Sequence, residues 1–253
     1  MKMPGGTTAL AALQLFILFQ VCFGVERALL PQARRLLVPW IMWSVIYAFG
    51  KSAQAWLQGE ALSDEFDYWM LFTGPSIHLW YLPFSFVCVA FAKFMFRALS
   101  WPVIYVLSLV IAAASLALTN TVDLTTPLAQ WSTVTSAAVI GLLVKGPVRQ
   151  RIVLVFSVIA MGFTVYVLGW TSGAWQTLVA AAVVLVVTEI RLPSTVISKR
   201  LSEVSFGIYL IHPAVYSVLL LVAASGTFSS YVFVIFLSAV AVFMLRRFVP
   251  VLV

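Results

Sequence analysis

The uncharged segment WPVIYVLSLVIAAASLALT, residues 101–119, decides the fold class of this chain. A helix of this length crosses the roughly 30 Å hydrocarbon core of a membrane. Similar apolar runs recur and are separated by short breaks that hold the charges and much of the glycine and proline. They predict nine spans, at about residues 8–24, 36–56, 78–96, 101–119, 128–144, 152–169, 173–190, 204–224 and 228–245.

The composition also indicates a membrane protein. Hydrophobic residues make up 63% of the 253 residues and charged residues only 9%, whereas a soluble domain carries roughly 25% charged residues. The alternating apolar and polar strands of a membrane barrel are absent from the sequence. We therefore predict an all-α, polytopic transmembrane helical bundle in which residues 1–253 form a single domain.

The basic residues gather on one side of the predicted bundle. Thirteen of the 15 fall in alternate breaks or at the end of the last span: Arg27, Arg34, Arg35, Lys93, Arg97, Lys145, Arg149, Arg151, Arg191, Lys199, Arg200, Arg246 and Arg247. The positive-inside rule makes this side cytoplasmic, which predicts an external N-terminus and a cytoplasmic C-terminus. The net charge of +7 is therefore a topology signal, and a nucleic-acid partner gains little support.

Cysteine and histidine are too few to build a redox or metal site. Cys22 and Cys88 both fall inside apolar runs, where thiols pack as small hydrophobic groups. With two histidines and no buried acidic cluster, we predict neither a disulfide framework nor a metal site.

Three predicted helices carry polar residues on one face, and such faces tend to point into a bundle or a cavity. Ser205, Tyr209, His212 and Tyr216 follow one another at helical spacing. Pro213 removes a backbone hydrogen bond beside them. The other two faces are His78, Tyr81, Ser85 and Cys88, and Trp40, Trp43 or Ser44, Tyr47 and Lys51. Together they are expected to line a path across the membrane.

Each of these residues also has a structural interpretation. An intramembrane histidine such as His78 or His212 often serves as a hydrogen-bonding partner between helices. Trp80 and Tyr81 suit the aromatic belt at the membrane boundary, and Arg34 and Arg35 suit a purely topological role. The residues alone leave both interpretations open.

The order of three motifs resembles the acyltransferase-3 family. The segment "ALLPQARRLLVPWIMWSVIY" (28–47) is similar to the Arg-rich entry and proline-containing helix of that family. "HLWYLPF" (78–84) resembles its His-Leu-Trp stretch, and "VSFGIYLIHP" (204–213) resembles its late Ser-Tyr-Leu-His motif. The resemblance covers nearly the whole chain.

The resemblance implies an integral membrane enzyme in a bacterial plasma membrane. This enzyme would move an acyl group, commonly acetyl, from cytoplasmic acyl-CoA to a carbohydrate hydroxyl. The acceptor would be a surface or extracellular glycan such as an exopolysaccharide. Acyl-CoA would be a co-substrate, with no bound cofactor. Arg34 and Arg35 would bind the CoA phosphates, since guanidinium groups form paired hydrogen bonds with phosphate. Histidine is the usual base near neutral pH. The corresponding site residues are His212 and His78 as catalytic candidates, and Trp80, Tyr81, Ser205 and Tyr209 as substrate-chamber candidates.

The chain departs from the family pattern at its start. The first helix of the family, which supplies the presumed catalytic histidine, has no counterpart, and Gln32 stands where a second arginine is expected. Two interpretations stay open: the sequence is N-terminally incomplete, or the protein is a divergent member with altered or lost catalysis. The main rival function is transport of a glycan or lipid-linked sugar, although no predicted span has a central Asp or Glu. A third possible function is that of a catalytically inactive scaffold.

Overall fold

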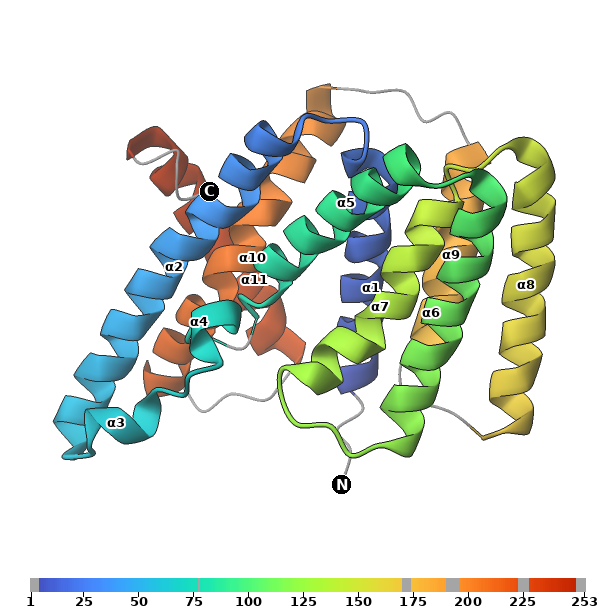
Figure 1. Cartoon of the computed structure of the whole chain (residues 1–253). Coiled ribbons are helices and arrows are strands. Elements are labelled where there is room, and N and C mark those ends of the chain that lie inside the picture. Colours follow the sequence, from blue (N-terminus) through green and yellow to red (C-terminus); the bar gives the residue numbers. More distant parts are fainter. Residues whose placement is uncertain (1–4, 77, 170–173, 190–195, 223–227, 249–253) are drawn as a thin grey trace. The chain divides into compact units, whose positions relative to one another are not determined.

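The computed structural model describes residues 5–76, 78–169, 174–189, 196–222 and 228–248. Across these residues all regular secondary structure is helical, as predicted (Figure 1). The helices are α1 (Gly5–Gly24), α2 (Leu29–Gln58), α3 (Leu62–Glu65), α4 (Met70–Thr73), α5 (Tyr81–Ala98), α6 (Trp101–Thr121), α7 (Leu128–Leu143), α8 (Val148–Val167), α9 (Ala174–Glu189), α10 (Val196–Val222) and α11 (Phe228–Phe248).

The helices overlap the predicted apolar runs and have a membrane-like composition. In the described part of the chain, α2, α5 and α6 are long and apolar enough to cross a membrane. Shorter apolar stretches lie in α1, α7, α8, α9 and α10. The helical, membrane-like architecture is therefore confirmed, whereas the nine crossings and their orientation stay predictions.

Local sequence explains where several helices begin and end. Pro102 lies in the first turn of α6, where a missing backbone N–H costs no intrahelical hydrogen bond. Gly169 follows α8 with φ of +66°, the left-handed conformation that glycine adopts readily after a helix. Proline and glycine thus set helix boundaries here, as their positions in the sequence predicted.

The chain packs as two compact units, each assembled from segments that are distant in sequence. Unit 1 consists of Met1–Ala33 and Phe84–Arg191, and unit 2 of Arg34–Pro83 and Leu192–Val253. The division falls within α2 and near the start of α5, so each of these helices contributes to both units.

In unit 1, α7 packs against α1, α6 and α9 (Figure 1). Gly141 of α7 faces the backbone of α1, and a Cβ atom at this position would lie 2.7 Å from the carbonyl oxygen of Leu18. Polar groups link the same helices, because Gln14 donates to the carbonyl of Thr133 at 3.0 Å. Small residues at close contacts and interhelical hydrogen bonds are the usual means of packing helices in lipid.

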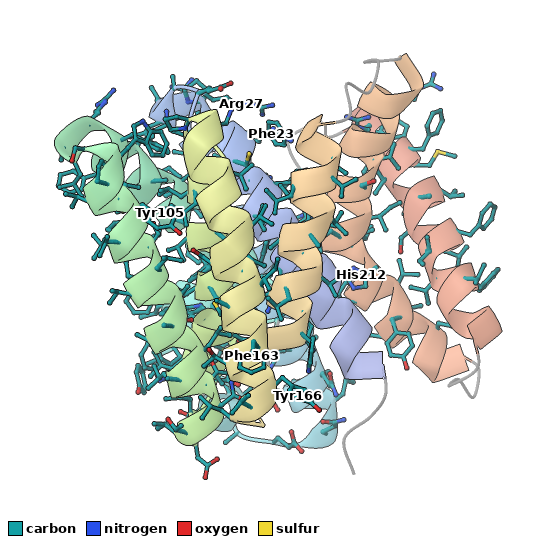
Figure 2. The ribbon with its side chains drawn as sticks, turned by 90° about the vertical axis from the view of Figure 1, so that its right-hand side faces the viewer. Phe23, Arg27, Tyr105, Phe163, Tyr166 and His212 are labelled. Atoms are coloured by element: carbon teal, nitrogen blue, oxygen red, sulfur yellow. The ribbon has the colours of Figure 1, made fainter. Side chains whose placement is uncertain are left out.

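On the outside of unit 1, α8 presents exposed aromatic side chains. Figure 2 shows Phe163 and Tyr166 on this helix, and they are 69% and 74% exposed. In a membrane protein such a surface is expected to face lipid, where it costs no desolvation of polar groups.

Basic residues from separate breaks meet at one end of unit 1. Lys145 forms an ion pair with Glu26 at 2.5 Å, and Lys93 donates to the carbonyl of Arg27. The hydrogen bond and the charge of Lys145 hold the pKa of Glu26 below its ordinary value. Lys93 and Lys145 therefore lie at the same end of unit 1 as the segment between α1 and α2, while the membrane topology stays a prediction. Lys2 and Arg191 lie outside the described residues, as do the side chains of Arg149, Arg151, Lys199 and Arg200.

In unit 2, α10 packs along α11, and α2 contacts α10 through a side chain. The hydroxyl of Tyr47 in α2 donates to the carbonyl of Leu210 in α10 at 3.0 Å. Farther along α2, Lys51 forms an ion pair with Glu65 of α3 at 3.2 Å. These contacts place α2 beside the helix that carries His212.

Candidate functional site

A tight turn, rather than a helix, carries His78. Gly74 ends α4 with φ of +79°, and a Cβ atom there would lie 2.9 Å from the Cβ of Leu79, so this position requires glycine. The backbone N–H of Leu79 then donates to the carbonyl of Ser76 at 3.0 Å. The helix that we predicted from residue 78 begins only at Tyr81. Pro83 explains this late start, because proline is tolerated only in the first turn of a helix.

Pro213 leaves one carbonyl of α10 without its helical donor. In a regular helix the N–H of residue 213 would donate to the carbonyl of Tyr209, but proline has no N–H. His212 takes this place, since its Nδ1 lies 2.9 Å from the Tyr209 oxygen and 3.2 Å from the Ile208 oxygen. Figure 2 shows His212 in the middle part of α10. The proline that interrupts the backbone ladder therefore positions the adjacent imidazole.

The same contact fixes which nitrogen of His212 carries the hydrogen. A carbonyl oxygen only accepts, so Nδ1 of His212 must donate, and in the neutral ring Nε2 is then an acceptor. No described group forms a hydrogen bond with this Nε2. His212 therefore presents a lone pair that is ready to take a proton.

His78 has the opposite arrangement. Its Nε2 lies 3.3 Å from the carbonyl oxygen of Leu210, the same oxygen to which Tyr47 donates. Nε2 must therefore carry the hydrogen, and Nδ1 is the acceptor. The hydroxyl of Ser76 lies 3.0 Å from this Nδ1 and donates to it. Both ring nitrogens of His78 are thus engaged.

Aromatic rings enclose the two histidines. The ring of His78 meets Tyr47 edge-on at a centroid distance of 5.2 Å and Tyr209 at 5.6 Å. The His212 ring lies 5.7 Å from that of His78, and Tyr81 meets Tyr209 at 5.5 Å. The hydroxyl of Tyr209 also donates to the backbone carbonyl of His78. We call these five residues, together with Ser76, the histidine–tyrosine cluster.

The cluster favours neutral imidazole rings. Every described hydrogen-bond partner of His78 and His212 is a hydroxyl or a backbone carbonyl. In the described residues no group of three or more metal-ligating side chains surrounds them. A neutral, half-buried imidazole is suited to accepting and returning a proton.

Comparison with known proteins assigns the chain to a family. The family model described as an acyltransferase domain, that of the acyltransferase-3 family, matches residues 23–247. The chain belongs to the acyltransferase-3 family. No curated protein and no solved structure matches it significantly. Membership supports a membrane acyltransferase type of function, and the matched region contains the whole histidine–tyrosine cluster.

The structure gathers some of the predicted acyltransferase site residues and separates others. His78, Tyr81, Tyr209 and His212 belong to one cluster in unit 2. Trp80 is buried, with its ring 6.4 Å from that of Tyr81.

The two arginines and the serine of the predicted site lie away from the cluster. Arg34 and Arg35 are exposed in an early turn of α2. Arg35 precedes Tyr47 by twelve residues, or about 18 Å along the helix axis. Ser205 is also exposed, about 10 Å along α10 from His212.

Ser76 of the cluster and the Leu210 carbonyl that contacts it were not predicted as site residues, and Tyr47 was predicted only as part of a polar helix face. Ser76 precedes His78 by two residues, but only the turn at 76–79 brings its hydroxyl onto the imidazole. The carbonyl of Leu210 is a backbone group, so no side-chain pattern identifies it. Pro213 is the one available signal, because a proline inside an apolar helix predicts an open carbonyl nearby.

Proposed function

We propose that this protein is an integral membrane O-acyltransferase that transfers an acyl group, with acetyl as the leading candidate, from acyl-CoA to a carbohydrate hydroxyl of a surface or extracellular glycan. The observation that carries the proposal is the anchored ring of His212, whose Nδ1–H donates to the Tyr209 carbonyl while Nε2 keeps its lone pair. The family supports the reaction type. We assign His212 as the base that takes the proton of the acceptor hydroxyl.

The donor is proposed to enter along α2 from the cytoplasmic side of a bacterial plasma membrane. CoA carries phosphate groups, and the exposed guanidinium groups of Arg34 and Arg35 suit phosphate recognition. The roughly 18 Å between Arg35 and Tyr47 would let a donor held at its phosphates extend its thioester toward the cluster. Acyl-CoA acts as a co-substrate in this scheme.

The acceptor is proposed to lie against the aromatic side of the cluster. Tyr81 and Tyr209 supply ring faces and edges suited to the apolar faces of a sugar, and Trp80 lies beside Tyr81. Ser205, on the same side of α10 as Tyr209 by helical spacing, would line the route along which the donor approaches.

The donor site is tested by CoA binding to the purified protein in lipid nanodiscs. Replacing both Arg34 and Arg35 by Ala should raise the Kd for acetyl-CoA at least about tenfold, because each charge-assisted hydrogen bond contributes roughly 1.5–3 kcal/mol. The matched control replaces Arg246 and Arg247, the basic pair in the last turn of α11, and changes the net charge equally. Equal loss of affinity in both double variants would remove the donor-site assignment.

The reaction is tested with labelled acetyl-CoA and a panel of mono- and oligosaccharides. His212→Gln should lower the rate of acyl transfer about a hundredfold or more, since general-base catalysis contributes 10²–10⁴. Ser217→Gln introduces the same side chain at an exposed position of α10 and should retain most activity. Sugar uptake into vesicles containing the wild-type protein, with no acylation of any sugar, would establish transport and contradict the proposal.

A further inference from the structure

We propose that Ser76 is a nucleophile that carries the acyl group as a serine ester between donor and acceptor, with His78 as its base. This inference rests on the proposed function and makes it more specific. It replaces one direct transfer between two bound substrates by two successive transfers through the protein. The chemical class of its substrate is an acyl thioester.

The hydrogen bonds around His78 have the order that an activated nucleophile requires. The Ser76 hydroxyl donates to Nδ1 of His78 at 3.0 Å, and Nε2–H of the same ring donates to the Leu210 carbonyl at 3.3 Å. Enzymes that form acyl-enzyme esters use the same hydrogen-bonded order: a nucleophile, then a base, then a group that orients the base. Here a backbone carbonyl takes the orienting position.

The pair is held by its surroundings on several sides. The backbone carbonyl of Ser76 accepts the N–H of Leu79, and that of His78 accepts the hydroxyl of Tyr209. The rings of Tyr47 and Tyr209 both contact the imidazole edge-on. A reacting group needs this type of support, because small displacements of a nucleophile or base reduce the rate strongly.

Two other described serines, one in each unit, have a different environment. Ser217 donates to the carbonyl of Pro213 at 2.9 Å, and Ser115 donates to the carbonyl of Ser132. A hydroxyl bound to a carbonyl has no base to take its proton. Ser76 is half-buried and bonded to an imidazole nitrogen, which combines access with activation.

The proposed sequence of steps balances in atoms and charge. In the first step Oγ of Ser76 attacks the thioester carbonyl, and its proton moves to Nδ1 of His78. The C–S bond then breaks while His78 passes this proton to the leaving sulfur, so CoA departs as the thiol and the His78 ring is neutral again. In the second step the acceptor oxygen attacks the serine ester while its proton moves to Nε2 of His212. The bond to Oγ then breaks, and the proton on His212 passes through water to Oγ of Ser76.

The test is intact-protein mass spectrometry after incubation with acetyl-CoA in the absence of sugar. Wild-type protein should gain one acetyl group, located on Ser76 by fragmentation. Ser76→Ala should lose this adduct and at least about a hundredfold in transfer rate. The control Ser217→Ala should keep both. Melting temperatures near wild type exclude unfolding as the cause.

A second variant tests the chemistry of the bond. Ser76→Cys should form an adduct that neutral hydroxylamine removes, because a thioester reacts with hydroxylamine far faster than a serine ester does. Sugar acetylation that persists in Ser76→Ala, or that proceeds in wild type without any adduct by rapid quench, overturns the inference while leaving the proposed function intact. If wild-type protein acetylates neither itself nor any sugar, the proposed function fails, and this inference fails with it.

Discussion

Replacing Gly141 by alanine should destabilise the packing of α7 on α1. The new Cβ would lie 2.7 Å from the carbonyl oxygen of Leu18 and 3.1 Å from its Cα, whereas ordinary contacts begin at 3.4 Å. The helices must therefore separate by up to about 0.7 Å at this point, taken as the difference between 3.4 and 2.7 Å. Overpacking of this kind costs roughly 1–3 kcal/mol.

Gly50 provides a matched control for this substitution. It lies inside α2, and nothing lies within 4 Å of a Cβ built there. Alanine in a helix interior is favoured over glycine by about 1 kcal/mol, and this gain is common to both positions. The free energies of unfolding of the Gly141→Ala and Gly50→Ala proteins should therefore differ by about 1–3 kcal/mol, with Gly141→Ala the less stable.

Gly162 adds an intermediate case, because its Cβ would lie 3.2 Å from the side-chain Cδ1 of Leu178, and a side chain yields more easily than a backbone. The assay is reversible unfolding in mixed micelles under increasing denaturing detergent, which avoids irreversible thermal aggregation. Equal stability of Gly141→Ala and Gly50→Ala would show that α7 and α1 do not approach closely through Gly141.

Three further changes test the site and the charged end. Pro213→Ala should raise the free energy of unfolding by up to about 3 kcal/mol, because alanine restores a regular helix. It should also slow acyl transfer, because the new backbone N–H competes with His212 for the Tyr209 carbonyl. Unfolding and activity are measured on one preparation. Tyr47→Phe should cost about 0.5–1.5 kcal/mol of unfolding free energy by removing a donor to Leu210. The pKa of Glu26 is held below its ordinary value, so its ion pair stabilises the fold at pH values above the ordinary pKa and loses this effect as the pH falls. The small difference in melting temperature between wild type and Glu26→Gln should therefore vanish in acid.

The helices were predictable because the length of an apolar run is a local property of the sequence. Each long described helix overlaps a run that lacks charge in its middle, and proline and glycine set several of its ends. The predicted start of α5 was wrong by three residues. The turn before this helix depends on Gly74 and on the hydrogen bond from Leu79 to Ser76, which hydropathy does not reveal. The short helices α3 and α4 were likewise not predicted from their acidic segment.

The histidine–tyrosine cluster was predictable only in part. Helical spacing placed Tyr209 and His212 on one side of α10, and the polar start of α5 drew attention to His78 and Tyr81. These faces were expected to line one path, but the individual contacts between them could not be predicted, because His78 and Leu210 are separated by 132 residues and come together through tertiary packing. The tautomers follow only from which atoms face the carbonyl groups.

A backbone carbonyl is a suitable orienting group for a histidine inside a membrane. A carboxylate in that position would stabilise the charged ring, but placing an ionised side chain in hydrocarbon costs several kcal/mol. The backbone carbonyls of Tyr209 and Leu210 hold the imidazoles of His212 and His78 without adding a charge, and the hydroxyl of Tyr47 also donates to that of Leu210. In the proposed reaction the positive ring is then less stabilised and should be short-lived, which favours rapid transfer of the proton onward. Because the orienting atoms belong to the backbone, substitutions of the Leu210 side chain should leave the tautomer of His78 unchanged, whereas removing Pro213 should alter that of His212.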